Sequence, residues 1–418
     1  MRVILMTSFY PPEIAASIYL VANLAEDLAC KGFKVDVVTT MPIRGVDKDT
    51  IDEYKNKKTE ILYGGNLTIH RVNIGISDNG SFIKRALRSL LVTWKLFFKG
   101  ITIKGDLIFC YSTPPTLGIA AILAGKIKRI KVIYNLQDIF PDSLINTGKI
   151  EKGPLLKLGR LLEKASYKGS DKIVVISKDF KRIIMERGVH ENKIDLIYNW
   201  VDENEVVPVP REQNILIPRY NLPKDAFYIT YCGNTGFTQN LELLIDVAKS
   251  LENLMDFKFV ILGDGANKSN LINYARDKDA GNVIFLPFQP YEEISHVFSL
   301  GDVGVIISKK GIGGNSFPSK TWSIMSAARP VLASFDEDSE LCEIINNAQC
   351  GRCVPPEDFN ALRKAVLYFY YNRQNIDAIG LNGRKYILNN LSRKAGTEKY
   401  YKILKNACNE DNHKIKSI

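Results

Sequence analysis

Two glycine-containing turns could bring backbone amide groups close to a phosphate. The first, YCGNTG at 231–236, follows a short apolar run and precedes a helical pattern, and the second, GDG at 263–265, follows the next apolar run. Because glycine has no Cβ, the N–H groups of such turns can approach an anion directly. Neither turn is a complete G-x-G-x-x-G, and each could be a turn alone. Their positions after successive strands of one expected sheet favour a nucleotide site.

A third motif places a lysine where a helix is expected to begin. The sequence GGNSFPSK at 313–320 leads into a helical pattern predicted for 319–328. Proline suits a first helical turn, serine can cap it, and the unpaired N–H groups of a helix start attract anions. Lys320 is unfavourable for the helix dipole at this position, which indicates that an external anion such as a diphosphate balances the charge. The alternative is a solvated lysine on an ordinary helix.

The elements that must position these motifs alternate between short strands and helices. In the first half, strands are predicted at 2–6, 35–39, 107–111, 132–135, 173–176 and 194–198, and helices at 17–31 and 154–168. In the second half, strands are predicted at 228–232, 258–262, 283–286, 303–307, 331–333 and 352–354, and helices at 241–250, 319–328 and 359–371. This alternation predicts an α/β fold with two Rossmann-like, doubly wound parallel sheets facing a cleft.

Length and composition fit two ordinary globular domains. With 418 residues, 45% hydrophobic and 24% charged, the chain is neither disordered nor a polytopic membrane protein. We predict a first domain at 1–201, a proline-bearing linker at 202–227, a second domain at 228–385 and a helical C-terminal segment at 386–418. The N-terminus leads directly into a predicted strand and has no signal-peptide pattern. The odd number of cysteines, seven, in apolar surroundings indicates reduced core residues, so we expect a cytoplasmic protein.

The net charge of +10 is concentrated in the first half of the chain. Residues 1–200 contain 31 Lys and Arg against 20 Asp and Glu, so this half carries the whole excess. Such asymmetry indicates a polyanionic partner, either nucleic acid or an anionic membrane. Because no module with base-reading or base-stacking residues is recognisable, we do not expect a nucleic-acid partner.

The segment 81–105 has the pattern of a helix that lies in a membrane surface. It contains six Lys or Arg and no Asp or Glu, and on a helix its apolar residues fall on one arc beside an arc of cations. Such a helix would bury aromatic residues among lipid headgroups and attract anionic lipid. The alternative is an ordinary amphipathic helix packed on the first sheet. The predicted membrane residues are Lys84, Arg85, Arg88, Trp94, Phe97 and Phe98.

Several motifs together resemble one family of enzymes. They are YPP at 10–12 after the first strand, YNWVD at 198–202 at the junction, GDG at 263–265, and PSK at 318–320 followed by ARP at 328–330. Over nearly its whole length the chain resembles the retaining family 4 glycosyltransferases of the GT-B fold. With QDIFPDS at 137–143, it is most similar to the bacterial subgroup that includes N-acetyl-L-fucosamine transferases of O-antigen and capsule synthesis.

This resemblance implies sugar transfer, with retention of configuration, from a UDP-sugar bound by the second domain, without a cofactor or metal. It implies an acceptor bound by the first domain, near Tyr10, and C-terminal helices that cross back to that domain. In the subgroup the acceptor is a polyprenyl-diphosphate-linked saccharide, so we expect peripheral association with the inner face of the plasma membrane. The expected donor-binding residues are Gly233, Asn234, Thr235, Gly236, Gly263, Asp264, Gly265, Asn315, Ser316, Ser319, Lys320 and Ser323.

The chain departs from the family at several charged positions. Two glutamates that the family commonly carries correspond to Asn315 and Ser323, and the Arg and Lys of its phosphate-binding turn correspond to Asn234 and Gln239. Lys320 is therefore the expected catalytic cation, supported by backbone amides. Asp138 stands where many members have a histidine that contacts the sugar; it could bind sugar hydroxyls or the acceptor, or cap a helix.

Other functions are compatible with parts of the sequence. A non-hydrolysing sugar-nucleotide epimerase shares the two-domain architecture, and a nucleotide-sugar-binding subunit without activity would tolerate the missing glutamates. The acidic run DED at 336–338 could hold a divalent cation against a diphosphate, as in single-domain transferases. Its late position, in a run of acids after a strand, favours a solvated loop instead.

Overall fold

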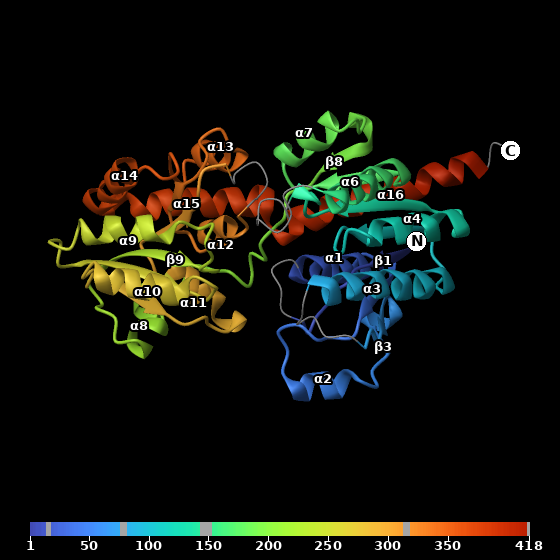
Figure 1. Cartoon of the computed structure of the whole chain (residues 1–418), viewed down its shortest axis with the longest axis horizontal. Helices are drawn as coiled ribbons and strands as arrows, with labels where there is room; N and C mark the ends of the chain where they lie inside the picture. Colours follow the sequence, from blue (N-terminus) through green and yellow to red (C-terminus); the bar gives the residue numbers. More distant parts are fainter. Residues whose placement is uncertain (14–17, 76–81, 143–152, 312–317, 416–418) are drawn as a thin grey trace. The chain divides into compact units, whose positions relative to one another are not determined.

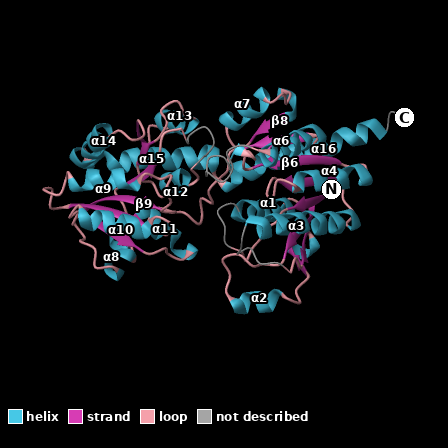
Figure 2. Ribbon diagram, viewed as in Figure 1, coloured by secondary structure: helices cyan, strands magenta, loops and turns pink. Residues whose placement is uncertain are grey.

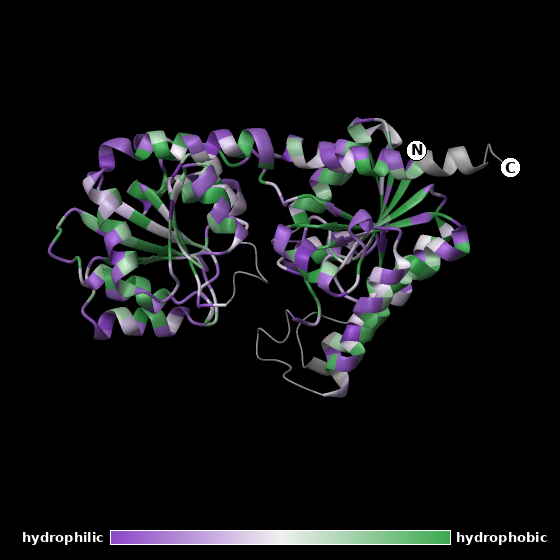
Figure 3. Cartoon of the chain, turned by 90° about the horizontal axis from the view of Figure 1, so that it is seen from above, coloured by the Kyte–Doolittle hydropathy of each residue, from purple (hydrophilic) through white to green (hydrophobic). Residues whose placement is uncertain are grey.

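The computed structural model describes residues 1–13, 18–75, 82–142, 153–311 and 318–415, and the chain forms two α/β units (Figure 1). The first unit contains Met1–Tyr198 and Gly396–Ile418, and the second contains Asn199–Ala395. Each unit has its own sheet with helices around it (Figure 2). The strands are mostly hydrophobic whereas the helices mix hydrophobic and hydrophilic residues (Figure 3), which places each core on its sheet. Among the described residues, no helix is long and apolar enough to cross a bilayer.

The sheet of the first unit has eight strands in the order β3-β4-β2-β1-β5-β6-β7-β8. All neighbours are parallel except β3 and β4, which are antiparallel. The strands are β1 (Arg2–Met6), β2 (Lys34–Thr40), β3 (Thr59–Leu62), β4 (Leu67–Val72), β5 (Leu107–Tyr111), β6 (Lys131–Leu136), β7 (Lys172–Val175) and β8 (Ile194–Leu196). The helices are α1 (Ile18–Cys30), α2 (Lys48–Tyr54), α3 (Phe82–Thr102), α4 (Leu117–Lys128), α6 (Pro154–Gly169) and α7 (Lys178–Glu186), with short turns η1 (Tyr63–Gly65) and η2 (Glu191–Lys193).

The central strands of this sheet are apolar throughout because helices cover both faces. Every residue of β5 is buried, as are all but the first residue of β1 and β2. In the outer strands the pattern differs, as expected at a sheet edge: the residues of β4 alternate between buried and partly exposed, and those of β3 are mostly exposed. All the parallel strands end at the same edge, so the segments that follow β1, β2, β4, β5 and β6 gather there.

The sheet of the second unit has six parallel strands in the order β11-β10-β9-β12-β13-β14. They are β9 (Phe227–Cys232), β10 (Phe257–Leu262), β11 (Val283–Leu286), β12 (Val303–Ile307), β13 (Val331–Ser334) and β14 (Gly351–Val354). The helices are α8 (Leu216–Arg219), α9 (Leu241–Lys249), α10 (Lys268–Asp277), α11 (Ile294–Ser299), α12 (Lys320–Ser326), α13 (Glu340–Asn347), α14 (Phe359–Tyr371) and α15 (Ile376–Tyr386), with turns η3 (Arg211–Gln213), η4 (Tyr291–Glu293), η6 (Arg373–Asn375) and η7 (Ile387–Leu391). The chain order reverses between β9 and β12, the position where open α/β sheets bind ligands.

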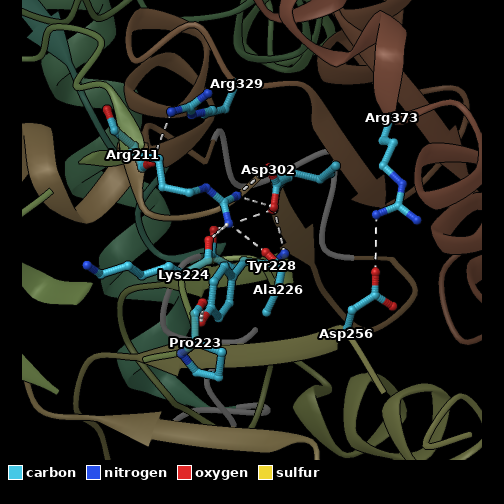
Figure 4. A network of polar contacts seen from close by, with 12 residues as sticks. Arg211, Pro223, Lys224, Ala226, Tyr228, Asp256, Asp302, Arg329 and Arg373 are labelled. Atoms are coloured by element: carbon cyan, nitrogen blue, oxygen red, sulfur yellow. Dashed lines mark hydrogen bonds and ion pairs between the residues drawn. The ribbon is translucent and has the colours of Figure 1, made fainter. Parts of the chain in front are cut away.

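The segment 202–227, expected to be a linker, packs as part of the second unit. The Arg211 guanidinium donates to both carboxylate oxygens of Asp302 at 2.6 Å and to the carbonyl oxygens of Lys224 and Ala226 (Figure 4). Asp302 also accepts the backbone N–H of Tyr228 at 2.7 Å. These bonds hold the start of β9 in place. The proline content that indicated a linker instead reflects short turns around η3 and α8.

The last helix, α16 (Arg393–Ile415), begins in the second unit and from Gly396 onward belongs to the first. Thr397 donates to Asp27 at 2.8 Å, and Glu398 forms an ion pair with Lys31. The ring of Tyr400 is fully buried with its centroid 5.5 Å from that of Phe109 on β5. The C-terminal helix is therefore part of the core of the first unit, as the resemblance implied.

Candidate active site

The two glycine turns of the second unit interlock at the carboxyl end of its sheet. The Gly233 N–H donates to the Leu262 carbonyl oxygen at 2.8 Å, and the Thr235 N–H donates to the Asp264 carbonyl oxygen at 2.9 Å. Gly233 and Gly263 both have φ of +140°, which other residues rarely adopt, and a Cβ on Gly263 would overlap the carbonyl of Gly233. The two turns therefore form one rigid double loop in which glycine is required at both positions.

Other predicted donor-binding residues lie on this double loop. A Cβ on Gly265 would lie 2.5 Å from Asn234 Oδ1 and 2.7 Å from the Thr235 nitrogen, so this position too accommodates only glycine. Asn234 and Asp264 are exposed, whereas Thr235 is fully buried. The Thr235 hydroxyl has no hydrogen-bond partner among the residues that the structure describes. The loop thus exposes polar groups on a backbone that cannot relax easily.

Lys320, the first residue of α12, lies across this double loop. Its ammonium donates to the Tyr231 hydroxyl at 3.3 Å and sits 5.0 Å from the centroid of the same ring. A side chain on Gly233 would overlap the end of Lys320, so the glycine makes room for the lysine. Tyr231 in turn donates to the Asn234 carbonyl oxygen at 2.6 Å. Lys320 therefore joins the third predicted motif to the first glycine turn, which itself interlocks with the second.

The electrostatics of Lys320 favour an anionic ligand. Burial lowers the pKa of its ammonium from the ordinary value of 10.5 to about 8. It forms no ion pair with any residue in the described part of the chain, and its nearest polar partner is the neutral phenol of Tyr231. A buried cation without a counterion is costly, and a phosphate group beside it would remove that cost.

The remaining predicted donor residues are less informative. Ser319 stands directly before α12, but its hydroxyl makes no capping hydrogen bond, so the expected serine cap is wrong. Ser323 lies one turn further along α12 and is partly exposed. Asn315 and Ser316 lie outside the described residues. The acidic run at 336–338 is used structurally, since Asp336 accepts the Gly311 N–H at 3.0 and 3.1 Å. No cluster of metal-ligating side chains occurs within the described ranges.

Two family models match the chain, one in each half. Residues 19–205 match the model described as Glycosyltransferase Family 4, and residues 212–386 match the model described as Glycosyl transferases group 1. The chain is a two-domain glycosyltransferase.

Relatives and solved structures agree with this assignment. The probable glycosyltransferase WbjE of Pseudomonas aeruginosa is 27% identical over 266 residues, which are 63% of this chain and 66% of that protein. The putative colanic acid biosynthesis glycosyl transferase WcaI of Escherichia coli K12 is 25% identical over 390 residues, 89% of this chain and 94% of that protein. The crystal structure of Anabaena Alr3699/HepE in complex with UDP matches 97% of this chain and 100% of its own with a TM-score of 0.73 at 13% identity, which confirms the GT-B fold.

In the first unit of this glycosyltransferase, Asp138 follows β6 and lines a small pocket with Tyr134, Glu163 and Tyr167. Burial raises the pKa of its carboxyl group. Asp138 makes no hydrogen bond to another described residue, so a capping role finds no support there. Farther along the same motif, Asp142 forms ion pairs with Arg160 and Arg187, and these fix the loop.

Helix α3 carries two apolar faces rather than one. Trp94 and Phe98 are 51% and 58% exposed and stack on each other with ring centroids 6.1 Å apart. Phe97 and Arg88, expected on the membrane side, are only 8% and 5% exposed and face the interior, so these two assignments are wrong. Lys84 is exposed, and the side chain of Arg85 is outside the described set. Packing on the sheet therefore uses one face of α3 and leaves the other uncovered.

Two further helices near α3 also expose apolar side chains. On α3 the uncovered face consists of Leu87, Leu90, Trp94 and Phe98, which we call the α3 stripe. Helix α4 packs beside α3, and α6 packs beside α4. These helices expose Leu123 and Ile127 on α4, and Leu158 and Leu161 on α6. Exposed lysines accompany them, including Lys95, Lys126 and Lys164. A helical projection treats one helix at a time, so the sequence indicates the apolar residues of α3 but not those of α4 and α6.

Tyr10 is buried and therefore does not present its ring to an acceptor as expected. Burial raises the pKa of its hydroxyl well above the ordinary range. Its backbone N–H donates at 3.4 Å to Glu13, a residue outside the motifs that predicted the site. The sequence does contain a signal for Glu13, because this glutamate directly follows the YPP motif, after the first strand and at the carboxyl edge of the sheet.

Proposed function

We propose that this glycosyltransferase moves a sugar from a UDP-sugar to a lipid-linked saccharide, with retention of configuration, during surface polysaccharide synthesis. The donor sugar is an N-acetylated amino sugar such as N-acetyl-L-fucosamine. The observation that carries the proposal is the position of Lys320 over Gly233, where a partly buried cation has no counterion among the described residues. The UDP bound in the structurally similar HepE supports a UDP-sugar donor. The colanic acid biosynthesis in the name of WcaI supports a role in surface polysaccharide synthesis.

The chemistry required of Lys320 is stabilisation of a leaving group. When the bond between the sugar C1 and the β-phosphate oxygen breaks, negative charge grows on the UDP, and a preorganised cation beside it lowers the barrier. The acceptor hydroxyl then bonds to C1 on the same face, and its proton passes to the departing phosphate oxygen. This route needs no metal and no protein nucleophile. The double loop contributes N–H groups and a fixed shape, and Asp138 orients the acceptor from the first unit.

The acceptor is proposed to reach the enzyme at a membrane surface. The α3 stripe, with the exposed leucines of α4 and α6, gives an apolar surface flanked by lysines. Apolar and aromatic side chains beside cations suit the headgroup region of an anionic bilayer. The reacting end of a polyprenyl-diphosphate-linked saccharide lies at that level. The enzyme would thus work peripherally at the inner face of the plasma membrane, with soluble donor arriving from the cytoplasm.

One assay tests the reaction directly. The purified protein is incubated with a panel of UDP-amino sugars and a polyprenyl-diphosphate-linked acceptor, and release of UDP is followed together with the product sugar. Release of UDP only when acceptor is present, with the anomeric configuration retained, is the expected result. Conversion of the donor to an epimer without acceptor would establish the epimerase alternative. Binding of UDP-sugar without any turnover would establish a binding subunit.

A further inference from the structure

Helix α13 and strand β14 bring two thiol groups together in the second unit. Cys342 lies in the first turn of α13, which packs against β14, and Cys353 lies on β14, paired with Ala333 of β13. The two thiols are hydrogen-bonded to each other, and this bond lowers the pKa of the Cys342 thiol. Cys342 is buried, whereas Cys353 is partly exposed. Such a pair, with one sulfur open to solvent, is suited to oxidation.

A third cysteine nearby is not part of this pair. Cys350 has the C-x-x-C spacing to Cys353 along the sequence. Its thiol instead donates to the Ile345 carbonyl oxygen at 3.7 Å, and its side chain is fully buried. The fold therefore selects Cys342, eleven positions before Cys353, as the partner of the exposed thiol.

Hydrogen bonds connect the first turn of α13 to the segment after β12. Ser339 caps α13 by accepting the Cys342 N–H at 3.4 Å, and its own N–H donates to the Asp336 carbonyl oxygen at 3.0 Å. The Asp336 carboxylate accepts the Gly311 N–H at 3.0 and 3.1 Å. The position of Cys342 is thereby linked to that of Gly311.

The same segment contacts the double loop of the candidate active site. Two residues before Gly311, the Lys309 N–H donates to the Thr238 carbonyl oxygen at 3.0 Å. Thr238 directly follows the first glycine turn, 231–236, after one intervening residue. Residues 309–311 therefore lie between the cysteine pair and the loop that carries Gly233.

We propose that Cys342 and Cys353 form a disulfide when the protein meets hydrogen peroxide, and that this disulfide weakens binding of a nucleotide diphosphate at the double loop. The inference rests on the proposed function, because it regulates the same donor site. A covalent bond requires the two sulfurs to approach more closely than a hydrogen bond does, so it draws the first turn of α13 toward β14. Asp336 directly precedes that turn, and its bond to Gly311 is lost as the turn moves.

The oxidation balances with peroxide as the sole oxidant. Cys353 passes its proton to the Cys342 thiolate, and its sulfur attacks one peroxide oxygen. The O–O bond breaks, leaving a sulfenic acid on Cys353 and hydroxide, which becomes water with the proton that Cys342 had released. The Cys342 thiol then displaces the hydroxyl group of the sulfenic acid, which leaves with the thiol proton as a second water. The peroxide is reduced, and the two sulfurs are oxidised to a disulfide.

Peptide mapping tests the oxidation. The whole protein is treated with hydrogen peroxide, free thiols are blocked with N-ethylmaleimide, and a digest is analysed by mass spectrometry without reduction. We expect the peptides of Cys342 and Cys353 to be joined, and dithiothreitol to separate them. Cys350→Ser should give the same product, because a serine can still donate to the Ile345 carbonyl oxygen. Cys342 and Cys353 that stay unpaired, or a disulfide between Cys350 and Cys353, would overturn the proposal.

Calorimetry with UDP tests the consequence. The oxidised wild type should bind UDP about tenfold more weakly than the reduced protein, the effect of losing one hydrogen bond to a charged group, and dithiothreitol should restore the affinity. Cys353→Ser, and Cys342→Ala as a second variant should the first fold poorly, should bind UDP equally before and after peroxide. A disulfide that leaves UDP affinity unchanged, or an equal loss in these variants, would refute the inference alone. If the reduced wild type binds no UDP, the proposed function itself fails.

Discussion

Replacing Lys320 by methionine should make the free protein more stable and donor binding weaker. The methionine side chain can follow the path of the lysine over Gly233 and Tyr231 without a charge. The fall of the Lys320 pKa from 10.5 to about 8 corresponds to about 3 kcal/mol against the charged form at pH 7, at about 1.4 kcal/mol for each step of one in pKa. Lys320→Met removes that penalty, so the free energy of unfolding should rise by up to this amount.

The sign of the pH dependence follows from the same change. Between pH 8 and 10.5 the unfolded chain still holds the Lys320 proton while the folded chain has lost it, so stability of the wild type rises with pH across this window. In Lys320→Met this rise should be absent. Urea denaturation of both proteins at pH 7 and pH 9 measures the difference. Lys268→Met is the matched control, because Lys268 donates to the carbonyl oxygens of Gly263 and Leu286, and its loss should lower stability.

UDP binding, unlike stability, should weaken when pH rises or when Lys320 is replaced. A diphosphate beside Lys320 restores its proton, so UDP binding at pH 8.5 to 9 should take up as much as one proton, and affinity should fall as pH rises through 8. Losing this charged hydrogen bond should weaken UDP binding by about 1.5–3 kcal/mol, on the order of tenfold to a hundredfold. Calorimetry in buffers of different ionisation enthalpy measures both quantities. Wild-type affinity that stays constant from pH 7 to 9.5 without proton uptake, or a Lys320→Met variant that binds UDP normally, would refute this reasoning.

Three further predictions concern the double loop, the membrane and the metal. Gly263→Ala should weaken UDP binding more than tenfold by calorimetry, since its Cβ would overlap the Gly233 carbonyl, whereas Gly281→Ala, where a Cβ meets nothing within 4 Å, should bind normally. The double variant Trp94→Glu, Phe98→Glu should not float with anionic vesicles, whereas Met255→Glu, a similar change at an exposed site of the second unit, should float like the wild type. Equal flotation of the wild type, the double variant and Met255→Glu would disprove the membrane surface. Turnover should be unchanged in EDTA, and a loss that Mg²⁺ restores would indicate a metal-dependent mechanism.

The strands were predictable because parallel strands covered on both faces are continuous apolar runs. β5 and β9 illustrate this, with every residue buried. The pattern failed at the sheet edge, where β3 is largely exposed and β4 alternates, and where α2 has no buried residue. Such elements bury too little apolar surface to stand out in sequence. β4 is determined by its pairing with β2, and β3 by its pairing with β4, rather than by their own hydrophobicity.

The site was predictable to the level of motifs but not of contacts. Sequence position placed Gly233, Gly263 and Lys320 after strands of one sheet, and the structure brings them together. Sequence position could not show that Lys320 lies on Tyr231, because this contact depends on where the chain places the start of α12 relative to β9. The error at Arg88 and Phe97 has a related cause. A helical projection gives the angle of each residue but not which neighbouring element covers it.

The positive charge of the first unit divides into two groups with different physical roles. Arg71, Arg160 and Arg187 are committed to Glu60, Asp142 and Glu163, so they neutralise buried carboxylates and leave little net field. Others, such as Lys126 and Lys164, are exposed on helices that also expose apolar side chains. Folding does not need this second group, because exposed like charges repel and contribute nothing to the core. Cations that cost stability next to uncovered apolar side chains are best explained by an anionic surface that meets both at once.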